Sequence, residues 1–268
     1  MFENEEKEER QEFRIKVLRI LHLVASIWML ALTIIFAVLE LDVDVSIVVN
    51  FPDQDDRDGA VGSPDQETIG KAEVSIYLSV FCALAAADHF VCAMLGFFKQ
   101  EFVQKWLFEY QANPLRWIEY SFSASIMAVL VAMVTGVYDI HLQFSIGLST
   151  AICMMTGFIV EIGFPREMDS WRIKTAAYSV YILGFIACFG PWLVILCYFF
   201  ESSGAPTFVY FIIFGELIAF AAFGINMFGY FFMKWWNFST YEGVYIILSF
   251  TAKTFLAFVT YGGFKSSE

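Results

Sequence analysis

The chain has 268 residues, and its composition is unusual for a water-soluble protein. Hydrophobic residues make up 59% of it, and only 16% are charged, against about 25% in an average soluble domain. The formal net charge of −12 argues against a nucleic-acid partner, which would require a basic surface. The composition instead predicts an all-α membrane protein with a single domain that crosses the lipid bilayer several times.

Seven apolar stretches are each near the ~20 residues that span a bilayer core. They are residues 15–39, 72–98, 115–138, 142–164, 173–200, 207–233 and 241–261. We therefore predict a seven-transmembrane-helix bundle over residues 15–262, preceded by an acidic N-terminal segment (1–14) and followed by a short tail (263–268). The five cysteines all fall inside apolar stretches and form no metal-binding pattern, so we predict no metal site.

The positions of Lys and Arg predict the orientation of this bundle. With seven spans, twelve of these residues fall on the side of the N-terminus: Lys7, Arg10, Arg14, Lys16, Arg19, Lys99, Lys105, Arg116, Arg166, Arg172, Lys174 and Lys234. Only Arg57, Lys71 and Lys265 fall on the opposite side. The positive-inside rule then places the N-terminus in the cytoplasm and the C-terminus outside the cell.

The longest connection, residues 40–71, lies between the first two spans and outside the cell in this topology. Residues 42–47 alternate between polar and apolar side chains, which is the period of a β-strand. The following residues 53–64 contain Asp, Pro and Gly, so we predict a short β-hairpin. An exposed strand here can pair with a second copy of the protein, and a plain solvated loop is the alternative.

Lys253 lies in the middle of the last apolar stretch. An ammonium group at mid-membrane depth costs at least ~3 kcal/mol, so this lysine must be paired, neutralised or used chemically. A buried lysine amine can condense with a carbonyl compound to form a Schiff base. We therefore asked whether the chain supplies a carboxylate partner and an aromatic pocket for an aldehyde.

The third stretch supplies the carboxylate. It begins with Arg116-Trp117-Ile118-Glu119-Tyr120-Ser121, which places Glu119 about 7 Å inside the membrane at 1.5 Å per residue. A lysine side chain that points back towards the N-terminus of its helix narrows the gap between Lys253 and Glu119. Arg116 lies one turn before Glu119 and can pair with it or with lipid headgroups.

These segments resemble a known family. An Arg-x-x-Glu sequence at the start of the third of seven spans, with a lysine in the seventh, resembles a microbial rhodopsin. The longer string through Ser123 and Ser125, the Ser249-x-x-x-Lys253 spacing and the inside N-terminus resemble the heliorhodopsin family. The resemblance implies all-trans retinal bound through Lys253, with Glu119 as the sole counterion and Arg116, Ser123 and Ser249 near the Schiff base. It also implies a homodimer formed through the first external loop.

Several further polar residues fall inside the apolar stretches. The resemblance implies that His22, His89 and Glu161 form a network that shares the Schiff-base proton, and histidine titrates close to neutral pH. Asp88 and Glu216 are two more intramembrane acids and are candidates for a proton path. Packed histidines and a protonated Glu216 bonded to a neighbouring helix are the purely structural interpretations.

The sequence lacks the carboxylates of an outward proton pump. Ser249 stands four residues before the lysine, where pumps often have an aspartate, and Leu130 stands where a proton donor would follow Glu119. We therefore predict a retinal-binding photoreceptor, not an enzyme, with a slow sensory photocycle and a cytoplasmic signalling partner. Two alternatives are a light-gated proton channel or transporter that uses Asp88, Glu119 and Glu216, and a seven-helix receptor or transporter without retinal.

Overall fold

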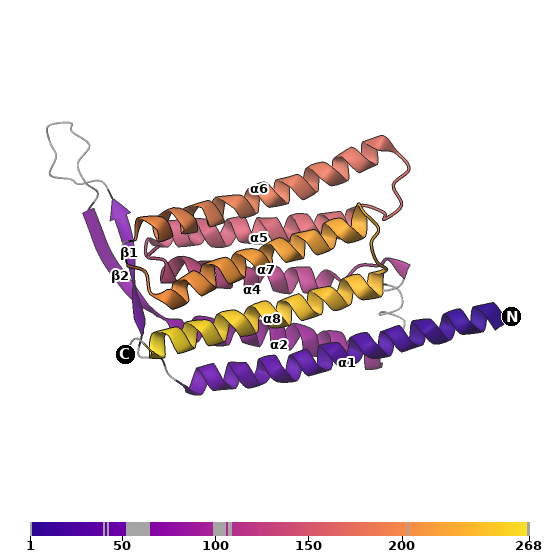
Figure 1. Cartoon of the computed structure of the whole chain (residues 1–268), viewed down its shortest axis with the longest axis horizontal. Coiled ribbons are helices and arrows are strands. Elements are labelled where there is room, and N and C mark those ends of the chain that lie inside the picture. Colours follow the sequence, from indigo (N-terminus) through magenta and orange to yellow (C-terminus); the bar gives the residue numbers. More distant parts are fainter. Residues whose placement is uncertain are drawn as a thin grey trace.

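The structure, a computed structural model, describes residues 2–39, 41, 43–51, 65–98, 106, 109–202 and 204–266. It contains seven long helices, α1 (Phe2–Val38), α2 (Val74–Phe98), α4 (Pro114–Val134), α5 (Ile140–Gly163), α6 (Trp171–Glu201), α7 (Thr207–Phe231) and α8 (Phe238–Lys265). All seven are long and apolar enough to cross a membrane, and they lie roughly side by side (Figure 1). The prediction of seven spans is confirmed.

Side-chain caps fix where the helices that carry the site begin. The side chain of Asn113 accepts a hydrogen bond from the backbone N–H of Arg116, and Pro114 occupies the first turn of α4. Asn237 caps α8 in the same way by accepting from the N–H of Thr240. These are the residue types that best satisfy the free N–H groups at a helix start. The caps set the register of Glu119 and Lys253 in their helices.

Three helix ends differ from the ends of the predicted apolar stretches. Helix α1 begins at Phe2 rather than near Ile15, and Figure 1 shows its N-terminal part extending beyond the rest of the bundle. Glu, Lys, Arg and Gln are good helix formers, so a charged segment can continue the helix outside the membrane. At the other end, α8 continues to Lys265, through the first half of the predicted tail. The second helix starts at Val74 rather than at Ala72, because the preceding strand runs to Glu73.

The predicted hairpin is confirmed. Strands β1 (Asp44–Phe51) and β2 (Asp65–Glu73) pair antiparallel, with Val45 opposite Ala72 and an irregularity after Ile47. Its turn lies outside the described residues. The hairpin rests on the turn between α4 and α5, where Asp139 accepts hydrogen bonds from the backbone N–H and the side-chain amide of Asn50 at 3.2 and 2.9 Å. This contact ties the hairpin to the helix that carries Glu119.

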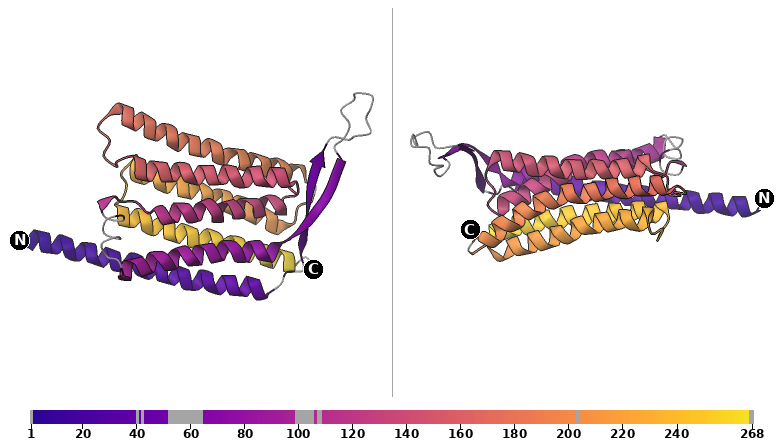
Figure 2. Two further views of the ribbon diagram at one scale, coloured as in Figure 1. Left: turned by 180° about the vertical axis from the view of Figure 1, so that it is seen from behind. Right: turned by 90° about the horizontal axis from the view of Figure 1, so that it is seen from above.

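Each helix packs against only some of the others. Helix α1 packs beside α2 and α8, α4 packs between α2 and α5, and α6 packs along α5 (Figure 2). Aromatic side chains bridge α6 and α7, including the pairs Trp192–Phe220 and Tyr181–Phe228, whose ring centroids are 5.5 and 5.8 Å apart. Aromatic rings therefore form contacts between these two helices.

Candidate functional site

The buried lysine of α8 meets the carboxylate of α4. The side chain of Lys253 is 3% exposed, and its Nζ atom donates hydrogen bonds to Glu119 Oε1 and Ser249 Oγ, both at 2.9 Å. Ser249 lies one turn before the lysine, so the side chain points back along its own helix, as helical geometry favours. This direction closes the difference in depth between Lys253 and Glu119. The structure brings together all three residues.

The pairing explains how the membrane tolerates this ammonium group. A buried ion pair is held by good geometry, and removing one partner costs roughly 3–5 kcal/mol because it leaves an uncompensated charge. The ring of Tyr120 adds a further contact, because Lys253 Nζ lies 5.1 Å from its centroid. Serine and tyrosine groups around the nitrogen therefore supplement a single carboxylate.

An apolar pocket opens directly beside Lys253. Its walls include Tyr120, Ser123, Met127, Phe220 and Phe223, from helices α4 and α7. The hydroxyl of Ser123 is buried and has no hydrogen-bond partner among the described residues. Ser123 thus lines the same pocket as Lys253.

A second pocket adjoins the first, between α5, α6 and α7. The two share Tyr120, Met154, Phe220 and Phe223 in their walls. Ligand pockets usually have mostly apolar walls with a few polar groups. Adjoining apolar pockets that begin at a lysine nitrogen have the chemical character that a long polyene aldehyde such as retinal requires.

Glycines on α5 and α7 determine the shape of the second pocket. A Cβ atom added at Gly157 would lie 2.3 Å from the ring of Trp117, and one added at Gly224 would lie 2.5 Å from the ring of Phe185. Both distances are far below van der Waals contact. The aromatic walls therefore stand where they do because these positions have no side chain.

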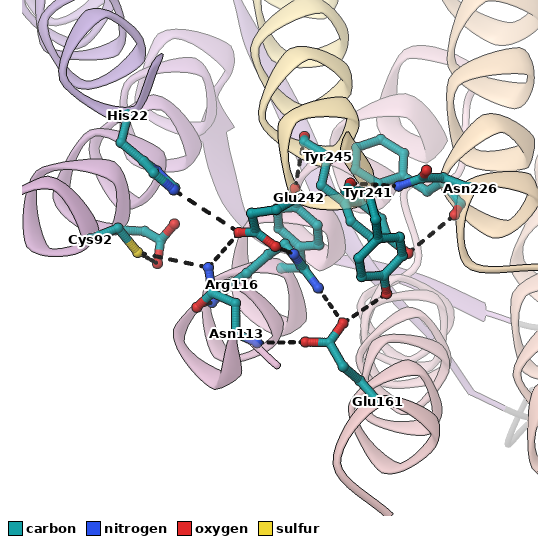
Figure 3. Close-up of polar contacts among 12 residues, drawn as sticks. His22, Cys92, Asn113, Arg116, Glu161, Asn226, Tyr241, Glu242 and Tyr245 are labelled. Carbon is teal, nitrogen blue, oxygen red and sulfur yellow. Dashed lines mark hydrogen bonds and ion pairs between the residues drawn. The ribbon is translucent and has the colours of Figure 1, made fainter. Parts of the chain in front are cut away.

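The arginine predicted near the Schiff base has other partners. The guanidinium of Arg116 pairs with Glu161 and Glu242 (Figure 3), and within the described part of the chain it forms no ion pair with Glu119. Its side chain is 3% exposed and lies over the ring of Tyr245, 4.1 Å from the centroid. The expectation that Arg116 pairs with Glu119 or with headgroups was wrong. Two glutamates on other helices attract it more strongly than the acid one turn away.

Glu242 is the functional candidate that the sequence analysis missed. It lies in the second turn of α8 with a fully buried side chain, and it also accepts a hydrogen bond from Asn113 Nδ2 at 2.6 Å (Figure 3). Glu161 accepts from the backbone N–H of Asn113 at 2.6 Å and from the Tyr241 hydroxyl at 2.7 Å. The signal was an acid at the start of the last apolar stretch, which the sequence analysis did not consider.

The two histidines meet, as their assignment to one network required. The Nδ1 atoms of His22 and His89 are 3.0 Å apart, and both side chains are buried. His22 Nε2 lies 4.0 Å from Glu242 Oε1, and Glu242 leads through Arg116 to Glu161. The residues predicted to form a network are thus connected, but through Glu242.

The remaining two intramembrane acids have different surroundings. Asp88 lies 3.7 Å from His89 Nδ1 and 3.8 Å from the thiol of Cys92, so it borders the histidine pair. Glu216 is completely buried in α7, and neither of its oxygens has a hydrogen-bond partner among the described residues. The interpretation of Glu216 as a carboxyl group bonded to a neighbouring helix is not supported within this part of the chain.

Seven membrane helices with a paired lysine in the last one define the class of retinal-binding rhodopsins. Three solved structures share the fold. The transmembrane domain of the Salpingoeca rosetta rhodopsin phosphodiesterase has a TM-score of 0.66 and 14% identity, with 98% of this chain and 89% of that chain covered. A light-driven proton pump from Leptosphaeria maculans has a TM-score of 0.58 and 13% identity, with 95% of each chain covered. Exiguobacterium sibiricum rhodopsin has a TM-score of 0.57 and 16% identity, with 94% and 98% covered.

The sequence matches the heliorhodopsin family over residues 14–264, so the chain belongs to the heliorhodopsin family. No curated protein matches it. Family and fold together make it a multi-pass membrane protein of the retinal-binding photoreceptor type. The identities to the three solved structures are low, so those structures support the fold and not the individual activities.

Proposed function

We propose that the chain is a sensory photoreceptor that binds all-trans retinal through Lys253 and has a slow photocycle. The observation that carries this proposal is the hydrogen-bonded pair of Lys253 and Glu119 beside two adjoining apolar pockets. Retinal, when bound, supplies visible-light absorption and a double bond that isomerises. The pocket supplies apolar walls, and the pair supplies the only short ion contact to the lysine nitrogen among the described residues.

The chain's own residues would hold and move the proton at Lys253 Nζ. Glu119 Oε1 balances the positive charge on this nitrogen and is the nearest group that can accept its proton. Ser249 Oγ bonds the same nitrogen and limits its orientation. The paired imidazoles of His22 and His89 are the proposed store for the proton, and Glu242 and Arg116 connect them to Glu161.

A sensory role is favoured over outward pumping because Ser249 and Leu130 occupy the two positions where proton pumps often have carboxylates. Ser249 bonds the lysine nitrogen, and Leu130 is fully buried in the apolar core. A pump needs acids on both sides of the lysine.

We further propose that the N-terminus is cytoplasmic, that α1 or its neighbours contact a cytoplasmic signalling partner, and that the protein is not an enzyme. Homodimerisation through the hairpin remains part of the proposal, because β2 pairs with β1 on one edge and its residues are mostly exposed.

One observation favours a second function, a light-gated proton channel or transporter. Glu216 lies near enough to Lys253 to interact with it electrostatically, and its unpartnered carboxyl group is surrounded by apolar residues. Such a group is a default functional candidate inside a membrane. Whole-cell current under illumination separates the two functions. A photocurrent in the wild type that disappears in Glu216→Gln would refute a purely sensory role, and no photocurrent would refute the channel.

The test of the proposed function is an absorption spectrum taken after adding all-trans retinal to the expressed protein. We expect a visible band that Lys253→Ala abolishes. Glu119→Gln should move the band to longer wavelength, because the counterion stabilises the positive charge at Nζ in the ground state. No band, or a band that survives Lys253→Ala, would favour a seven-helix receptor or transporter without retinal. An unchanged maximum in Glu119→Gln would show that another group is the counterion.

A further inference from the structure

Four carboxyl groups are buried near the starts of α4 and α8, and three of them have short hydrogen-bond donors. Glu119 accepts from Lys253 Nζ at 2.9 Å. Glu161 accepts from Arg116, a backbone N–H and a tyrosine hydroxyl, and Glu242 accepts from Arg116 and an amide. Such charge-assisted or multiple hydrogen bonds stabilise an ionised carboxylate. These three groups therefore have the partners that an anion requires.

The fourth carboxyl group, that of Asp88, lacks such partners among the residues that the structure describes. Its side chain is 6% exposed, and its two contacts are the Cys92 thiol at 3.8 Å and His89 Nδ1 at 3.7 Å. A thiol is a weak donor, and 3.7 Å exceeds the length of a hydrogen bond to nitrogen. The same His89 nitrogen lies closer to His22 Nδ1, at 3.0 Å. An ionised carboxylate would be poorly stabilised here.

Asp88 is nevertheless part of the polar site. Polar contacts form a closed circuit from Asp88 to His89, His22, Glu242, Asn113, Cys92 and back to Asp88. Glu119, Lys253, Glu242 and Arg116 are all near enough to act on it electrostatically. Because electrostatic interactions are mutual, a charge on Asp88 also acts on the lysine nitrogen.

The charges in this region do not balance unless protons are held by some of the acids or histidines. Two cations, Lys253 and Arg116, face the four carboxyl groups Asp88, Glu119, Glu161 and Glu242. The other titratable groups around Asp88 are His22 on α1 and His89 and Cys92 on α2. Two neighbouring carboxyl groups that act on one cation do not both ionise readily. Because Asp88 has the weakest donors, it is the acid that keeps its proton at least cost.

We propose that Asp88 carries a proton in the dark state and is a second acid, beside Glu119, whose ionisation acts on Lys253 Nζ. This differs from the family resemblance, which implies Glu119 as the sole counterion. The step is a simple dissociation, in which the Asp88 carboxyl group releases its proton to solvent and becomes an anion. The effect of Asp88 on the absorption maximum rests on the proposed function, because it requires bound retinal. The protonation of Asp88 does not.

The first test is infrared spectroscopy of the full chain in the dark, with and without retinal, in H₂O and D₂O. A protonated carboxyl group has a carbonyl stretch that shifts on deuteration. We expect Asp88→Asn to remove one such component and Glu216→Gln, the matched buried carboxyl group, to remove a different one. A spectrum of the retinal-free protein that is identical in the wild type and Asp88→Asn would overturn the inference even if no pigment forms.

The second test is a pH titration of the absorption maximum in the dark. Ionisation of Asp88 adds a negative charge near Lys253 Nζ, so the wild-type band should shift to shorter wavelength as the pH is raised. We expect Asp88→Asn to bind retinal but lose this alkaline shift, and Asp88→Glu to keep it. An alkaline shift that persists in Asp88→Asn would refute a second acid at Asp88 and leave the retinal-binding function intact.

Discussion

Arg116 is held between two buried glutamates. The loss of the arginine and the loss of one glutamate therefore have different effects on stability. Its guanidinium bonds Glu161 and Glu242 and lies over Tyr245. If the cation is removed, two neighbouring carboxylates are left without it. If one glutamate is removed, the arginine still has the other. The free energy of each loss therefore differs even though both break the same ion pair.

We expect Arg116→Gln to destabilise the protein by roughly 3–5 kcal/mol, the usual cost of leaving buried charges unpaired. Glu242→Gln should cost clearly less, because Arg116 keeps Glu161 and Asn113 can still bond the new amide. The measurement is the temperature or denaturant midpoint at which the retinal absorption is lost. Equal losses in the two variants would show that Arg116 depends on Glu242 alone.

The same residues show what sequence analysis can and cannot predict about the site. Lys253 stood out because it interrupts an apolar stretch, and Glu119 stood out as an acid inside the start of the third stretch, although it lies 134 positions away. Glu242 lies 126 positions from Arg116 at the end of a stretch, where an acid usually contacts water. Its burial depends on α1, α4 and α5 closing over the start of α8. No local pattern contains that information.

At the scale of helices, the apolar stretches predicted which segments span the membrane but not how closely they approach. Gly184 on α6 faces Thr156 on α5, and a Cβ atom added at Gly184 would lie 2.2 Å from Thr156 Oγ1. The Thr156 hydroxyl is itself bonded to the carbonyl oxygen of Cys153 at 2.7 Å. A glycine in an apolar helix indicates close approach. Which residue it approaches depends on the register of the two helices.

This contact predicts a compensating pair of substitutions. Gly184→Ala should destabilise the bundle by roughly 1–3 kcal/mol through overpacking, reduced by up to about 1 kcal/mol because alanine favours helix. Adding Thr156→Ala removes the colliding oxygen, so the double variant should be more stable than Gly184→Ala alone. Thr156→Ala alone is the control for the lost hydrogen bond. Thermal loss of the retinal band measures all three, and a double variant no more stable than Gly184→Ala would contradict the contact.

At the scale of the whole molecule, the two ends of the bundle differ in charge and in structure. The N-terminal end carries the extension of α1, and the hairpin and the C-terminus lie at the opposite end (Figure 1). An odd number of spans requires the termini to be on opposite sides of the membrane, and twelve of the Lys and Arg residues lie on the N-terminal side. The sequence therefore predicts the direction of the whole bundle, which the arrangement of helices alone does not determine.

Cysteine labelling tests that direction. We expect Glu67→Cys in β2 and Ser266→Cys after α8 to react with a membrane-impermeant maleimide on intact cells, because both would face outwards. Glu12→Cys in α1 should react only after the membrane is permeabilised. The wild-type chain, whose five cysteines lie within helices, gives the background. If Glu12→Cys reacts on intact cells and the other two variants are protected, the bundle has the reverse orientation. The polar network would then lie on the outer side of Lys253, and a cytoplasmic signalling partner could not contact the start of α1.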